Sequence, residues 1–141
     1  MAAKHILVGT DLSESSKHAV ESTAEYARAH GSRVSVVHVI DSRAFLPPQA
    51  VLRPETEAER LDGAKVALDG LRASLLFGLD SEAVVLMDHS AARAICDFAK
   101  ENDVDAIAVG SQGYGRVEKW LIGSVAERIV RHAHCTVFVF R

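Results

Sequence analysis

Residues 105–124 read DAIAVGSQGYGRVEKWLIGS, and this stretch predicts a buried strand, a glycine-containing loop and the start of a helix. The strand, 105–110, is almost entirely apolar, as is typical of a parallel strand covered on both faces. Gly110 and Gly113 allow the backbone to approach a neighbour closely or to adopt positive φ. The Gly-Ser pair at 123–124 precedes a helix, whose first N–H groups are unpaired and favour phosphate oxygens. The stretch therefore predicts an anion-binding loop.

A tight structural turn is the alternative interpretation of these glycines, because one glycine is often enough for a turn. The spacing matches neither the GxGxxG fingerprint nor a Walker loop. Arg116 could add positive charge in the middle of the loop, and Ser124 could donate from both its hydroxyl and its N–H. Both interpretations stay open on the residues of the loop alone.

The rest of the chain alternates short apolar runs with helical patterns. Strands are predicted at 4–9, 33–40, 82–87, 105–110 and 136–141, with helices ending near Gly31, spanning 55–77, beginning near Ser90 and beginning at Gly123-Ser124. This alternation predicts a single α/β domain over residues 1–141, a doubly wound parallel sheet with right-handed crossovers and helices on both faces. Segment 41–57 holds all three prolines and predicts a surface excursion or lid.

Composition excludes several classes of protein. The chain is 48% hydrophobic and 25% charged with a net charge of −3, which disfavours a general nucleic-acid binder or anionic-membrane binder. No apolar run is long enough for a membrane-spanning helix, and the N-terminal residues lack the pattern of a signal peptide. The two cysteines, Cys96 and Cys135, lack CxxC spacing. We therefore expect a protein of the reducing cytoplasm.

The sequence GTDLSESS at 9–16 follows the first predicted strand. In a doubly wound sheet, ligands bind at the carboxyl ends of strands where the strand order reverses. Asp11 could accept hydrogen bonds from a ribose or another polar ligand group. Equally, Asp11 and Glu14 fit a helix-capping box, and Ser13 is another cap candidate. The residues alone favour neither role of Asp11.

Catalysis and metal binding have little support. His132, His134 and Cys135 resemble a metal cluster but lie at a predicted helix end, where imidazoles are favoured electrostatically. His38 is predicted to be a hydrogen-bonded core residue, and Cys96 a buried, inert thiol. The serines lack a paired histidine base or a GxSxG elbow. We predict no catalytic residue and no protein-held metal.

The chain resembles the ATP-binding branch of the universal stress protein family. Gly110-x2-Gly113-x9-Gly123-Ser124 matches the family motif G-2x-G-9x-G(S/T), and KHILVGTDLSESS, VVHVID, VDAIAVGSQG and IGSVAERIVRHAHCTVFVFR resemble its flanks in consistent order. The resemblance covers essentially the whole chain. Gln112 departs from it, since histidine is common there, and so does Thr136, where proline is frequent.

The resemblance implies strand order 3-2-1-4-5, with ATP across the ends of strands one and four and Mg²⁺ bound mainly by the phosphates. Adenine would meet the Val39 backbone, Asp11 would contact the ribose region, and Gly9 and Thr10 would line the pocket. Around ribose and phosphates it implies Gly110, Ser111, Gln112, Gly113, Gly123, Ser124 and Val125. It also implies a homodimer in which the last strand, Thr136 to Phe140, pairs with its two-fold mate.

These features predict an ATP-binding regulatory or stress-response protein in which the nucleotide modulates a homodimer or a partner interaction. One alternative is a slow ATPase or nucleotidyl-transfer enzyme, although no general base or acidic metal pair is visible. A second alternative is a nucleotide-free interaction module of the same fold, which the intact glycine spacing disfavours.

Overall fold

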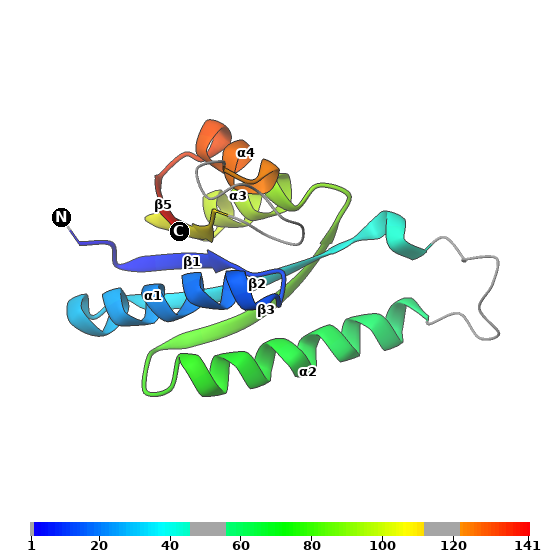
Figure 1. Cartoon of the computed structure of the whole chain (residues 1–141), viewed down its shortest axis with the longest axis horizontal. Coiled ribbons are helices and arrows are strands. Elements are labelled where there is room, and N and C mark those ends of the chain that lie inside the picture. Colours follow the sequence, from blue (N-terminus) through cyan, green and yellow to red (C-terminus); the bar gives the residue numbers. More distant parts are fainter. Residues whose placement is uncertain (1, 46–55, 112–121) are drawn as a thin grey trace.

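The computed structural model describes residues 2–45, 56–111 and 122–141 (Figure 1). Strands and helices alternate along the chain. In order they are β1 (His5–Gly9), α1 (Glu14–His30), β2 (Arg33–Asp41), the 3-10 helix η1 (Ser42–Phe45), α2 (Glu57–Leu75), β3 (Ser81–Asp88), α3 (Ala91–Glu101), β4 (Ala106–Gly110), α4 (Ser124–His132) and β5 (Thr136–Phe140). The predicted elements are confirmed with bounds that differ by one or two residues.

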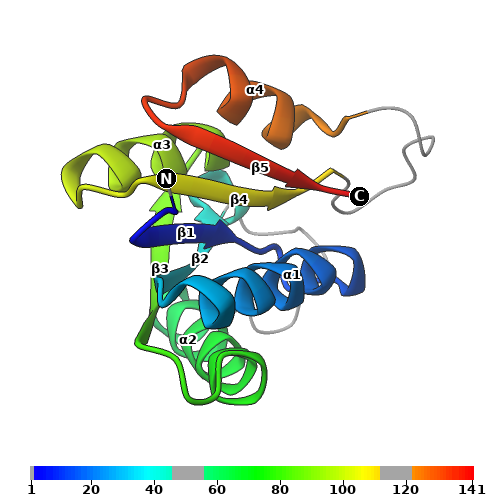
Figure 2. The same cartoon turned by 90° about the vertical axis from the view of Figure 1, so that its left-hand side faces the viewer.

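The strands of these described ranges form one five-stranded parallel sheet of order β3-β2-β1-β4-β5. The chain winds outward from β1 to β3 in one direction, then returns to the side of β1 and winds outward to β5 in the other. Helices α1 and α2 cover one face of the sheet, and α3 and α4 cover the opposite face (Figure 2). The predicted doubly wound α/β fold is confirmed, and so is the strand order implied by the family resemblance.

Alternation along the central strand divides the core between the two faces. Ile6 and Val8 of β1 pack in the cluster under α1 and α2, while Leu7 packs in the cluster under α3 and α4. All three side chains are fully buried. Successive side chains on a strand point to opposite faces, so a continuous apolar run is what a doubly covered strand requires.

Three of the four α-helices in the described ranges begin with a side-chain cap. Ser13, Thr56 and Ser90 each accept a hydrogen bond from the backbone N–H three residues further on. Such caps satisfy one of the first N–H groups of a helix, which have no partner within it. Helix α4 differs because its N-cap residue is Gly123, which has no side chain to accept such a bond.

The predicted excursion at 41–57 is described only at its ends. Asp41 is the last residue of β2, η1 covers 42–45, and Thr56 caps α2. Residues 46–55 lie outside the described part of the chain. Among the described residues, no helix has the length and apolar character needed to cross a membrane.

Candidate functional site

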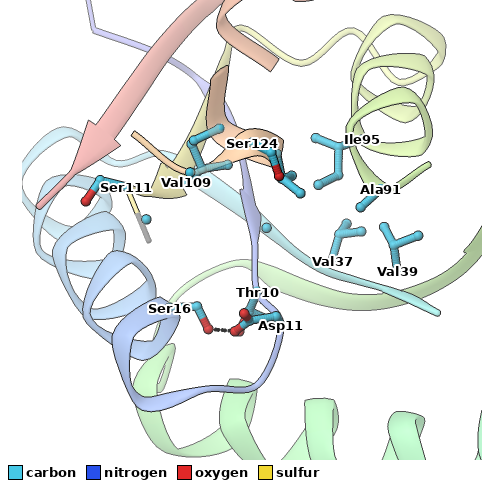
Figure 3. Close-up of a pocket in the computed structure, with 15 residues that line it drawn as sticks. Thr10, Asp11, Ser16, Val37, Val39, Ala91, Ile95, Val109, Ser111 and Ser124 are labelled. Atoms are coloured by element: carbon cyan, nitrogen blue, oxygen red, sulfur yellow. Dashed lines mark hydrogen bonds between the residues drawn. The ribbon is translucent and has the colours of Figure 1, made fainter. Parts of the chain in front are cut away.

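A cavity of about 350 Å³ opens at the carboxyl ends of β1, β2 and β4 (Figure 3). Because β2 and β4 lie on opposite sides of β1, this is the point at which the strand order reverses. Ligands of doubly wound sheets bind at such a point. The lining residues are Gly9, Thr10, Asp11, Ser16, Val37, Val39, Ala91, Ile95, Val109, Gly110, Ser111, Gly123, Ser124, Val125 and Ala126.

The loop after β1 is held in place by hydrogen bonds from Thr10. Its N–H donates to the carbonyl oxygen of Val37 at 2.9 Å, and its hydroxyl lies 2.8 Å from the hydroxyl of Ser16. The same hydroxyl accepts from the N–H of Leu12 at 3.0 Å. Leu12 has a φ of 66°, in the left-handed region that residues with a Cβ rarely adopt. The loop thus keeps a fixed, unusual path beside the cavity.

Asp11 supports the start of α1 without being its cap. Its Oδ1 accepts hydrogen bonds from the N–H of Ser13, at 2.9 Å, and from the Ser13 hydroxyl. Ser13 is the N-cap, and its hydroxyl accepts from the N–H of Ser16. The alternative of a capping box of Asp11 and Glu14 is therefore wrong, because Asp11 lies two residues before the cap and forms a side-chain turn there, whereas the other cap candidate, Ser13, is confirmed. Asp11 also borders the cavity.

Ser111 and Gly123, the residues at the two ends of the glycine-containing loop, are hydrogen-bonded to each other. The N–H of Ser111 donates to the carbonyl oxygen of Phe140 at 2.8 Å, and the N–H of Gly123 donates to the carbonyl oxygen of Ser111 at 2.6 Å. These bonds fix the two ends of the loop against each other and against β5. Of the predicted loop residues, Gln112, Gly113 and Arg116 lie outside the described part of the chain.

Helix α4 presents its first N–H groups to the cavity. The first hydrogen bond inside the helix runs from the N–H of Glu127 to the carbonyl oxygen of Gly123. The N–H groups of Ser124, Val125 and Ala126 precede it and have no acceptor within the helix. All three residues line the cavity. A helix start of this kind is electrostatically suited to an anion.

Part of the cavity wall is apolar. Val37 and Val39 reach it from β2, and Ala91 and Ile95 reach it from α3 (Figure 3). At Gly9 an added Cβ would lie 3.0 Å from Cδ1 of Ile95. Gly9 therefore allows Ile95 of α3 to approach the end of β1 closely.

All nine predicted site residues that the structure describes border this cavity. They are Gly9, Thr10, Asp11, Val39, Gly110, Ser111, Gly123, Ser124 and Val125. The sequence interpretation did not include Ser16, Val37, Ala91, Ile95, Val109 or Ala126. Ala91 and Ile95 belong to the apolar stripe expected on the third helix, and Val37 is two residues from Val39 on the same face of its strand. The helical spacing of Ala91 and Ile95 and the strand alternation of Val37 and Val39 were the signals that could have placed these residues in the site.

Two other titratable side chains of the described ranges were singled out in the sequence, His38 and Cys96. Nδ1 of His38 donates to the carbonyl oxygen of Thr10 at 2.9 Å, so this half-buried histidine is hydrogen-bonded as predicted. Cys96 is half-buried rather than fully buried, and burial raises the pKa of its thiol. Across residues 2–45, 56–111 and 122–141, no cluster of three or more His, Cys, Asp or Glu side chains could hold a metal ion.

Comparisons with known proteins agree with this fold. The model of the universal stress protein family matches residues 2–141. A putative universal stress protein of Staphylococcus haemolyticus is 29% identical over 140 residues, which cover 98% of this chain and 84% of that protein. The solved structure of the hypothetical protein MJ0577 superposes with a TM-score of 0.84 at 24% identity, covering 99% of this chain and 96% of its own.

Two similar structures contain nucleotides. A universal stress protein in complex with cAMP has a TM-score of 0.72 at 22% identity, covering 100% of this chain and 99% of that one. The universal stress protein of Archaeoglobus fulgidus in complex with dAMP has a TM-score of 0.67 at 23% identity, covering all of both chains. These similarities demonstrate a shared fold.

Proposed function

The chain belongs to the universal stress protein family, and we propose that it binds an adenine nucleotide, ATP, as a regulatory ligand in the cavity at the ends of β1, β2 and β4. The observation that carries the proposal is the uncapped start of α4. Within the described residues, three helices begin with a side-chain cap, whereas the helix that borders the cavity does not. No side chain at the N-cap accepts from its first N–H groups, which suits them to an acceptor from a ligand.

The cavity offers a different chemistry to each part of a nucleotide. The phosphates would lie against the N–H groups of Ser124 and Val125, near Ser111. The ribose would lie beside Asp11, whose carboxylate accepts hydrogen bonds from hydroxyl groups. The base would lie against Val39 in the apolar part. This order follows the sheet from β4 through β1 to β2, and the bound cAMP and dAMP of the two relatives are adenine nucleotides as well.

A divalent cation would accompany the phosphates. Magnesium keeps several water ligands and is commonly bound through substrate phosphates plus one or two carboxylates. Since the described residues offer no cluster of metal-binding side chains, we propose that the phosphates and water supply most of its ligands. The cation would reduce the charge of the triphosphate and would help it to bind to a protein whose net charge is −3.

Regulation through a homodimer is the second part of the proposal. Strand β5 forms one edge of the sheet and contacts the start of the glycine segment, because the N–H of Ser111 donates to the carbonyl oxygen of Phe140. An exposed edge strand can pair with a second copy. A phosphate that binds near Ser111 and Gly123 would therefore affect the hydrogen bond that connects Ser111 to β5 at this edge.

The direct test begins with protein purified without added nucleotide. The protein is denatured, and the released small molecules are identified by absorbance and mass spectrometry. Carried ATP, or a thermal shift when ATP and Mg²⁺ are added, supports the proposal. Accumulation of ADP during a timed incubation would favour a slow ATPase. The absence of both carried nucleotide and thermal shift would contradict nucleotide binding.

A proline variant tests the role of α4 in that binding. Proline is well tolerated at the first position of a helix, and Gly123 already has the extended backbone (ψ 157°) that a following proline requires. Ser124→Pro should therefore fold, lose one N–H and the hydroxyl, and bind ATP at least about tenfold more weakly by calorimetry. Ser124→Ala, which keeps the N–H, is the matched control. Equal affinity of the proline variant and the control would contradict the proposed phosphate contact.

A further inference from the structure

A second cavity, of about 220 Å³, lies beside the candidate nucleotide site. It shares Val39, Ala91, Ser124 and Val125 with the first cavity. Apart from Ala92, its further walls are charged or polar and consist of Asp41, Arg43, Asp88, His89, Ser90 and Arg128. We call this second cavity the annex. The two cavities are neighbours with a common wall, to which Val39 and Ala91 contribute from the apolar part and Ser124 and Val125 from the start of α4. A group that extends past Val39 and Ala91 enters the annex.

The proposed nucleotide runs along the strand ends from β4 through β1 to β2, and the annex lies at the next strand ends, those of β2 and β3. Ser111 follows β4, Asp11 follows β1 and Val39 belongs to β2, while Asp41 and Asp88 end β2 and β3 and are register partners. In adenine, the nitrogen that carries the ribose and the exocyclic N6 lie at opposite ends of the ring system. With the ribose beside Asp11 and the base against Val39, the N6 edge would face the annex.

The two carboxylates of the annex are already neutralised by their own partners. Arg43 donates to Asp41 Oδ1 from its backbone N–H at 2.9 Å and from Nε at 3.0 Å, and to Oδ2 from Nη2 at 2.8 Å. These hydrogen bonds lower the pKa of Asp41 to about 2. Asp88 accepts from the N–H of Ser90 at 2.9 Å and from Nη2 of Arg93 at 3.1 Å. The first of these bonds lowers the pKa of Asp88 most.

Arg128 is the cation that these carboxylates do not neutralise. Its guanidinium forms no ion pair within residues 2–45, 56–111 and 122–141, whereas Arg131, three residues further along α4, pairs with Glu127 at 2.9 Å. Arg128 lines the annex and Arg131 does not. Among the described residues, Arg43, Arg93 and Arg128 counted against Asp41 and Asp88 leave one positive charge in excess at the annex. A guanidinium with free donors is suited to a carboxylate or phosphate.

We propose that the annex is an extension of the nucleotide site that accepts adenine nucleotides with an anionic substituent on N6, and that Arg128 binds this substituent. The inference rests on the proposed nucleotide function and adds a ligand class to it. The volume of about 220 Å³ is large enough for a short branched chain. An excess positive charge favours an acidic chain over a neutral or basic one of the same length.

The experiment compares four ligands by calorimetry at one fixed ionic strength. They are AMP, N6-butyl-AMP, N6-(4-aminobutyl)-AMP and N6-(1,2-dicarboxyethyl)-AMP. The dicarboxylate should bind about fivefold more tightly than the butyl compound, because an exposed ion pair contributes modestly to affinity. The aminobutyl compound should be the weakest of the three N6-substituted ligands. In Arg128→Ala the advantage of the dicarboxylate should disappear, and in the matched control Arg131→Ala it should persist.

Two kinds of failure are distinguishable. If the protein binds neither AMP nor ATP, the nucleotide function itself is wrong, and the annex proposal with it. If AMP binds but the N6-substituted compounds do not, the N6 edge does not face the annex and only this inference is overturned. The annex proposal alone is also overturned if the dicarboxylate binds no better than the butyl compound, or if its advantage survives in Arg128→Ala.

Discussion

At Gly9 a side chain would be in tight contact with Ile95 of α3. An added Cβ would lie 3.0 Å from Cδ1 of Ile95 and 3.7 Å from Cγ1 of Val109. The first distance is shorter than ordinary van der Waals contact, so either Ile95 or the strand end must shift. The sequence interpretation placed Gly9 in the ligand pocket, and the structure adds a packing reason for the same glycine.

A larger residue at Gly9 should therefore push α3 away from β1. Gly9→Val is expected to lower the free energy of unfolding by about 1–3 kcal/mol, the usual cost of overpacking a dense core. It should also weaken ATP binding, because Ile95 lines the cavity. Chemical denaturation and calorimetry measure the two effects.

The double variant Gly9→Val with Ile95→Ala is the matched control. Removing the atoms that the valine meets should recover part of the lost stability. Additive losses in the double variant would show that the two positions do not interact, and would contradict the packing role of Gly9.

Asp11 illustrates why one residue supported two interpretations. Both Asp11 and Ser13 are residue types that start helices, and they stand two positions apart, so sequence alone could not say which is the cap. In the structure Ser13 caps α1 and Asp11 orients Ser13. The ligand role of Asp11 stays a prediction.

Replacement of Asp11 can measure the ribose contact. Asp11→Ala should weaken ATP binding about tenfold, through the loss of a charge-assisted hydrogen bond to a ribose hydroxyl. The loss should be much smaller for an ATP analogue that lacks both ribose hydroxyls. If the variant lost the same factor of affinity for both ligands, its effect would come from the disturbed loop at Ser13 instead.

At the scale of whole elements, the periodicity of apolar residues was sufficient to predict the strands and helices. The strands and helices were predicted within one or two residues because a doubly covered strand requires a continuous apolar run and a surface helix requires an apolar stripe. The annex was not predicted, because it depends on which charged residues the ends of β2, β3 and α4 bring together. The pairing of Asp41 with Arg43, and of Asp88 with Arg93, has no clear signature in sequence spacing.

A substitution at the start of α4 should weaken ATP binding and leave stability almost unchanged. In Gly123→Asp the new carboxylate can cap the N–H groups of the first turn, so stability should change by less than about 0.5 kcal/mol, since glycine and aspartate differ little as caps. ATP binding should nevertheless fall by at least about tenfold, because the carboxylate competes with the phosphates and repels them. Thermal unfolding and calorimetry provide the two readouts.

Gly123→Ala is the control for that variant. Alanine adds a Cβ but no acceptor, so ATP affinity should stay close to that of the unmodified protein. An aspartate variant that binds ATP as well as the alanine variant would show that these N–H groups do not hold the phosphates.

For the whole molecule, the alternation of strands and helices predicted a doubly wound sheet, and the family resemblance supplied its order. Pattern alone could not give that order, because it depends on which side of β1 each crossover takes. Order 3-2-1-4-5 leaves β5 at one edge. The carbonyl of Phe140 faces the β4 side, since it accepts from the N–H of Ser111, so alternation directs the N–H of Val139 outward.

Val139→Pro should therefore abolish pairing between two copies without removing a hydrogen bond to β4, because proline is accepted on strand edges that face solvent. Light scattering after gel filtration should show a dimer for the unmodified protein and for Val139→Ala, and a monomer for the proline variant. ATP should still bind to the monomer. A protein that is monomeric with and without ATP would refute the proposed dimer.

The central claim is that nucleotide phosphates bind to the N–H groups that begin α4. The most direct measurement is a nuclear magnetic resonance titration of the ¹⁵N-labelled protein with ATP and Mg²⁺, following each backbone amide. We expect large chemical-shift changes for the amides of Ser124, Val125 and Ala126. Changes are also expected at Ser111, near the phosphates, and at Val39, near the base. Saturating ATP that shifts other amides and leaves those of Ser124, Val125 and Ala126 unchanged would contradict the claim.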